Sequence, residues 1–148
     1  MIRRCISLLM VLFLLAGIIP ASAFADSLDN WRIRSPLPTG QALYGVTYGE
    51  GMYVAVGDKG TIVTSSDGAS WASQASGTTN LLRGVTYGNS IYVAVGDSGT
   101  ILTSSDGASW TSRTSGTTND LYGVTYGNGT YVAVGDKGTI VTSSDGAS

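Results

Sequence analysis

Aspartates are the residues of this sequence whose type and spacing could do chemistry. One set follows Ser-Ser and precedes Gly, and a second set follows Val-Gly. Both sets recur at the same constant interval: Asp67, Asp106 and Asp145 in the first, and Asp58, Asp97 and Asp136 in the second. Carboxylates that a fold gathers in one place can coordinate a hard cation, and a pair of them can serve as the acid and base of a glycosidase.

The first set is better explained by turn structure. An Asp next to Gly in a hairpin turn accepts hydrogen bonds from the backbone N–H groups that follow it. Trp71 and Trp110 come shortly after the first two of these aspartates and are expected to pack against the edge of a sheet. We therefore predict that the aspartates and the two tryptophans are structural.

The second set lies in a turn that would face the side of the molecule where ligands usually bind. A ring of three carboxylates there could attract a cation. Lys59 and Lys137, however, directly follow two of the three aspartates and offset their charge. We expect this set to stabilise turns as well, and we predict no metal site.

Enzyme chemistry has few residues available. The sequence contains no His, and Glu50 is its only glutamate. A Ser-His-Asp triad and a His-based metal site are therefore excluded, and a glycosidase would need two carboxylates at a defined separation. We predict no catalytic residue and no cofactor.

An internal repeat organises the chain. Leu-Tyr-Gly-Val-Thr-Tyr-Gly at 43–49 returns at 82–88, with Arg in place of the first Tyr, and again unchanged at 121–127. The units are 43–81, 82–120 and an incomplete 121–148. Each unit shows alternating apolar residues and glycine-rich turns, which predict four short antiparallel strands. That is the size of one blade of a β-propeller, and we predict an all-β fold of about three such blades; a β-solenoid is the alternative, but its coils are usually shorter.

The string Val-Gly-Asp-Lys-Gly-Thr-Ile-Val-Thr-Ser-Ser-Asp-Gly-Ala-Ser-Trp at 56–71 resembles the Asp-box (BNR) repeat. It is most similar to repeats of the photosystem II stability/assembly-factor-like secreted propellers. The usual box has one more residue between its Asp and its Trp, so the turn here must be tighter, and Ala69 stands at a position that usually holds Gly. The resemblance implies a propeller with the boxes on its outer side. Sialidases share the box, but their arginine clamp and Tyr–Glu nucleophile have no recognisable counterpart here.

Residues 1–25 have the pattern of a secretory signal peptide. Arg3 and Arg4 precede an apolar run from Ile6 to Ile19, and small residues suited to cleavage follow. The alternative is an uncleaved membrane anchor, but the run is shorter than the roughly 20 residues that a spanning helix needs. We expect a secreted or periplasmic protein that does not span a membrane. The net charge of −2 and the lack of a basic stripe argue against a nucleic-acid partner.

The sequence favours a non-catalytic binding or scaffold module with a protein or glycan partner. If there is a ligand site, we expect it at Tyr44, Arg83 and Tyr122, which are equivalent by the repeat and differ between otherwise nearly identical units. Tyr offers a flat apolar face with a polar tip. The alternative is a fragment of a larger secreted sialidase-like or other glycoside hydrolase, with its catalytic residues elsewhere.

Residues 26–42 are a possible closing strand. Trp31 would correspond to Trp71 and Trp110, and the residues after it could supply the fourth strand that the last unit lacks. Propellers typically close with about four to eight blades, so three are too few. The sequence therefore predicts either a fragment or a homodimer in which two chains complete a six-blade ring.

Overall fold

The computed structural model describes residues 31–148, and residues 34–148 form one compact unit that contains every strand. The predicted signal peptide at 1–25 lies outside the described residues. In the part described, no helix is long and apolar enough to cross a membrane.

The fold is all-β, as predicted from the repeat, and consists of three antiparallel sheets that do not close into a ring. The first sheet contains β1 (Leu43–Gly49), β2 (Met52–Gly57), β3 (Ile62–Ser65) and β4 (Ala72–Gln74). The second contains β5 (Leu82–Gly88), β6 (Ile91–Gly96), β7 (Ile101–Ser104) and β8 (Thr111–Arg113), and the third contains β9 (Leu121–Gly127), β10 (Thr130–Gly135) and β11 (Ile140–Ser143).

Each sheet is an up-and-down meander whose turns are set by local sequence. The first two strands of a sheet are joined by two residues with positive φ, such as Glu50 (φ 45°) and Gly51 (φ 76°). Two such residues match the right-handed twist of a tight hairpin. The second and third strands are joined by a single 3-10 turn, Asp58–Gly60 in the first sheet.

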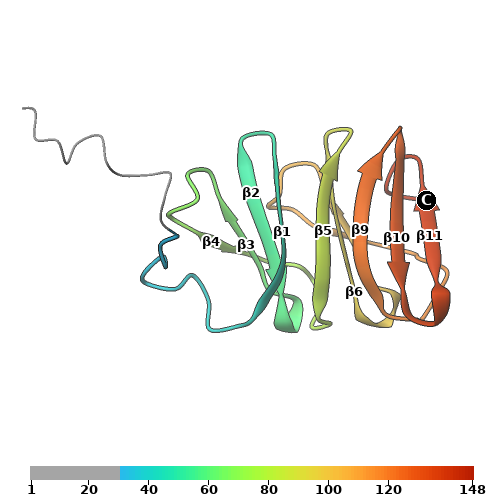
Figure 1. The fold of residues 1–148 in the computed structure, drawn as a ribbon, viewed down its shortest axis with the longest axis horizontal. Coiled ribbons are helices and arrows are strands. Elements are labelled where there is room, and N and C mark those ends of the chain that lie inside the picture. Colours follow the sequence, from blue (N-terminus) through green and yellow to red (C-terminus); the bar gives the residue numbers. More distant parts are fainter. Residues whose placement is uncertain (1–30) are drawn as a thin grey trace, which may run out of the picture. The chain divides into compact units, whose positions relative to one another are not determined.

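The sheets stack through their first strands, which lie side by side as β1, β5 and β9 in Figure 1. Glycines make this approach possible. A Cβ atom added at Gly45 would lie 3.2 Å from backbone atoms of β5, and one at Gly84 would lie 3.2 Å from the Cα of Gly123 in β9. Larger residues at Gly45 and Gly84 would push the sheets apart.

Two apolar clusters fill the space between neighbouring sheets. Between the first and second sheets, Val54, Val56 and Ile62 pack against Leu82, Val85 and Tyr92. Between the second and third sheets, Val93 and Val95 pack in the same way against Leu121 and Tyr131. Both clusters join different faces of successive copies of one repeat, so the core repeats as the sequence does.

The third sheet has three strands within the described residues. Residues 31–42 contain no strand. The remainder of the predicted closing strand, residues 26–30, lies outside the described residues, so the closing strand stays a prediction.

Candidate functional site

The Ser-Ser-Asp-Gly turns follow the third strand of each sheet, and their carboxylates are occupied by the turn itself. Asp67 Oδ1 accepts hydrogen bonds from the backbone N–H groups of Ala69 and Ser70, each at 2.8 Å, and from the Ser65 hydroxyl at 2.9 Å. The backbone bond from Ser70, followed by those from Ala69 and Ser65, lowers the pKa of Asp67 to about 2. Asp106 and Asp145 have the same arrangement and also have lowered pKa values. These contacts hold the turn together in each of the three units.

The two tryptophans stand beside these turns. Trp110 is largely buried against the cluster between the first two sheets, and its indole N–H donates to the Gly107 carbonyl at 2.9 Å. Its ring centroid lies 6.4 Å from that of Tyr92, and Trp71 lies at the same distance from Tyr53. Trp110 thus ties the turn to the core.

The three residues predicted as a ligand site lie at the second positions of β1, β5 and β9. Arg83 and Tyr122 are brought together, with the guanidinium carbon 5.1 Å from the centroid of the Tyr122 ring. Tyr44 and Tyr122 are 54% and 50% exposed, so both rings are open to solvent. We call this end of the sheets the rim: residues 42–44, 58–59, 81–83, 97–98, 120–122 and 136–137.

Carboxylates fix Arg83 in place at the rim. Its Nε lies 2.5 Å from Asp97 Oδ1, and its Nη2 lies 3.8 Å from Asp120 Oδ2. The hydrogen bond with Asp97 raises the pKa of Arg83. Asp120 also accepts a hydrogen bond from the backbone N–H of Ser98 at 2.9 Å.

Sequence reasoning overlooked Asp120. Its equivalents at the other two positions of the repeat are Leu81 and Ala42, so a carboxylate occurs here only at the end of the unit that contains Arg83. Arg83 and Asp120 both depart from the repeat and carry opposite charges. That combination could have identified their contact from the sequence.

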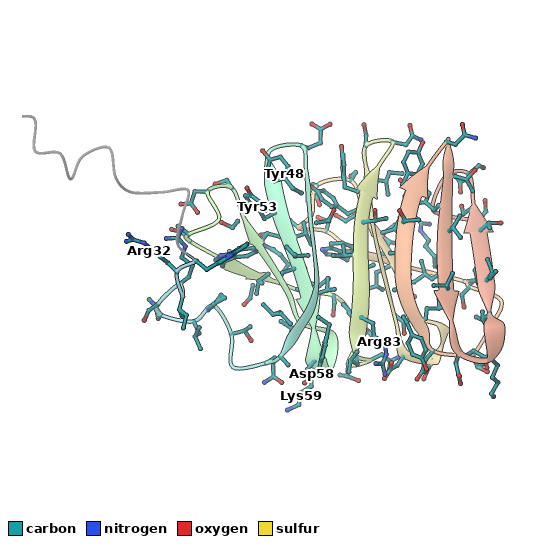
Figure 2. The ribbon with its side chains drawn as sticks, in the orientation of Figure 1. Arg32, Tyr48, Tyr53, Asp58, Lys59 and Arg83 are labelled. Carbon is teal, nitrogen blue, oxygen red and sulfur yellow. The ribbon has the colours of Figure 1, made fainter. Side chains whose placement is uncertain are left out.

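The other aspartates of the rim do not form a cluster. Asp136 accepts a hydrogen bond from the backbone N–H of Lys137 at 2.9 Å, and Asp97 is engaged by Arg83. Among residues 31–148, no three His, Cys, Asp or Glu side chains are grouped so that they could hold a metal ion. Figure 2 shows Asp58, Lys59 and Arg83 at this same end of the sheets.

Two open polar grooves lie between the outer parts of the sheets and repeat with the sequence. One, of about 760 Å³, is lined by the segments 98–100 and 112–119 and by part of the preceding loop. The other, of about 670 Å³, is lined by 59–62 and 73–79. Their walls consist mainly of Ser, Thr and Gly, which present hydroxyl groups and backbone rather than apolar side chains.

Fold and rim together define a propeller-type repeat protein with exposed aromatic rings at one end of its inner strands. Comparison with known protein families and with curated proteins gives no match for this chain.

Proposed function

We propose that the protein is a secreted, non-catalytic binding module that holds a neutral glycan at the rim. The observation that carries the proposal is the pair of half-exposed tyrosine rings, Tyr44 and Tyr122, at equivalent positions on either side of Arg83. A tyrosine ring offers an apolar face to the C–H groups of a sugar and a hydroxyl that can hydrogen-bond to it.

The charges of the rim favour a neutral ligand over an ionic one. Arg83 is already engaged by Asp97 and Asp120, so it is poorly available to bind an anion. Its role in the proposal is to hold the Tyr122 ring from one side through a cation–π contact. The hydroxyl-rich grooves nearby add donors and acceptors of the kind that sugar hydroxyls use.

We also place the repeats in the Asp-box (BNR) class. The support is the recurrence of the Ser-x-Asp-Gly turn at 65–68, 104–107 and 143–146, with a tryptophan following it in the first two units. The hydrogen bonds of Asp67 and Asp106 account for that aspartate as a turn-former, which leaves it no catalytic part in the proposal.

Binding to an array of neutral glycans, followed by titration calorimetry on the best ligand, tests the proposal. Tyr122→Ala should weaken binding about five- to tenfold or more, because a stacked aromatic contact contributes about 1 kcal/mol. Tyr122→Phe is the matched control, since it keeps the ring and should retain most of the affinity.

Because half of the Tyr122 side chain is already exposed, neither variant should unfold the protein. An affinity that Tyr122→Ala and Tyr44→Ala both leave unchanged would refute the rim as the site. Binding of acidic peptides in place of glycans would refute the ligand class.

A further inference from the structure

The two end sheets expose apolar faces that the middle sheet buries. On the first sheet, the face directed away from the second sheet carries four large apolar residues; we call it the leading face: Leu43, Val46, Tyr48 and Tyr53. Val46 is 64% exposed, whereas its equivalent in the second sheet, Val85, is 8% exposed because the first sheet covers it. Figure 2 shows Tyr48 and Tyr53 toward the end of the sheets opposite to Asp58 and Lys59.

The third sheet exposes the opposite apolar face, the one that the first and second sheets bury against the sheet that follows them. Its face directed away from the second sheet, the trailing face, carries Val134 and Ile140, which are 47% and 67% exposed. Their equivalents in the first sheet, Val56 and Ile62, are almost fully buried against the second sheet. Each exposed face is therefore one half of a contact that the chain makes elsewhere.

The polar part of this contact also repeats. The Tyr92 hydroxyl donates to the Gly49 carbonyl of the preceding sheet, and the Tyr131 hydroxyl donates to that of Gly88. Within residues 31–148, the equivalent tyrosine of the first sheet, Tyr53, and the equivalent glycine of the third sheet, Gly127, have no such partner. Among the described residues, the Tyr53 hydroxyl has no acceptor and no hydroxyl donates to the Gly127 carbonyl.

The glycines at the ends of the first strands show where a tyrosine ring of a neighbouring sheet packs and where it is missing. A Cβ atom at Gly49 would lie 2.1 Å from the Tyr87 ring, and one at Gly88 would lie 2.2 Å from the Tyr126 ring. At Gly127, the third member of the series, nothing lies within 4 Å of the added atom. The open space next to Gly127 is therefore equivalent to the spaces that Tyr87 and Tyr126 fill next to Gly49 and Gly88. Tyr48 is the equivalent tyrosine of the first sheet, and in the described part of the chain it has no such glycine to pack on.

We propose that two copies of this chain associate head to tail, with the leading face of each packed on the trailing face of the other. Tyr48 of one copy lies over Gly127 of the other, and the Tyr53 hydroxyl donates to the Gly127 carbonyl. Two identical contacts of this kind join two sets of three sheets into one ring of six, which is within the range of about four to eight blades found in propellers. Closure leaves neither apolar face exposed.

The N-terminal segment fits the same arrangement. Trp31 precedes Leu43 much as Trp71 precedes Leu82, with a single extra position between them. In the ring, residues 32–34 of one copy therefore come to the free edge of β11 of the other, where β4 and β8 stand in the complete sheets. A fourth strand there would cover an exposed sheet edge, which is otherwise open to unwanted pairing.

Sedimentation velocity on protein purified after expression of the full 148-residue sequence tests the proposal. The expected result is a single species with twice the mass of one chain over a wide concentration range. Gly127→Val should convert it to a monomer, because the valine side chain occupies the place of the partner's Tyr48. The substitution has no neighbour to strike within its own copy, so circular dichroism should stay unchanged.

The matched control is Gly40→Thr. Gly40 also has nothing within 4 Å of an added Cβ, and the equivalent positions Thr79 and Thr118 already carry threonine, so this variant should remain a dimer. Tyr53→Phe removes only the hydroxyl and should weaken the dimer about four- to hundredfold, because each of the two contacts loses one hydrogen bond worth a factor of about two to ten.

A wild-type monomer would overturn the proposal, and so would an open series of larger oligomers that grows with concentration. A dimer that survives Gly127→Val would show that another surface joins the copies and would equally overturn it. The ligand proposed for the rim has no part in these measurements, so the two proposals can fail separately.

Discussion

Replacing Trp110 with alanine should destabilise the protein by about 2.5–4 kcal/mol. A fully buried tryptophan costs roughly 3–5 kcal/mol when truncated to alanine, and the Trp110 ring is largely but not fully buried. A tryptophan buries about 150–250 Å² when fully enclosed, and about two thirds of that at about 25 cal/mol per Å² gives about 2.5–4 kcal/mol. Its hydrogen bond to the Gly107 carbonyl adds little where water can replace it.

The measurement is urea unfolding followed by far-UV circular dichroism, which does not depend on the fluorophore being removed. Gly127→Val serves as the parent, so that self-association does not contribute to the apparent stability. Trp31→Ala is the matched control, because the Trp31 side chain is fully exposed and its loss should change the free energy of unfolding by less than about 0.5 kcal/mol. A Trp110→Ala variant as stable as the Trp31→Ala variant would refute the packing role argued for the ring.

Two further predictions concern the turns and the contact between sheets. Backbone and hydroxyl donors lower the pKa of Asp67 to about 2 from its ordinary 3.8, so its stabilising effect is complete above about pH 4 and is lost as the pH falls toward 2. The melting temperature should therefore fall over that interval, and Asp67→Asn should make the fall shallower; an unchanged pH profile would contradict the argument. Gly49→Ala should lower the melting temperature strongly, because its Cβ would lie 2.1 Å from the Tyr87 ring, whereas Gly40→Ala should not; equal melting temperatures for the two variants would contradict the packing of that ring.

Much of the fold could be predicted because the same strand and turn pattern occurs three times in the sequence. Alternation in residues 43–49 gives the first strand, the glycine-containing pairs give the hairpins, and the constant spacing of the copies gives the size of the sheet. The weak fourth strand was also predictable, since it begins directly after the tryptophan, at Ala72 in the first sheet. These features depend on local pattern, which a repeat reinforces.

The candidate site was less accessible to the sequence. The positions of Tyr44, Arg83 and Tyr122 followed from the repeat, but the partners of Arg83 did not. Asp97 directly follows β6, which pairs with β5 in the same sheet, whereas Asp120 precedes β9 of the next sheet. The approach of Asp120 to Arg83 therefore depends on how neighbouring sheets stack. Sequence spacing alone does not fix that stacking.

The exposed faces show a limit that belongs to repeat proteins in general. Tyr53, Tyr92 and Tyr131 stand in identical six-residue strings, yet they are 37%, 1% and 3% exposed. Identical local sequence forms the same strand in each sheet, while the environment of each strand depends on whether another sheet precedes it. A tyrosine that packs between sheets keeps that capacity in the first sheet, where the described residues supply no partner. The residues that stabilise the interior of the described array are therefore exposed on its first and third sheets, and they are the residues that the proposed contact with a second copy would bury.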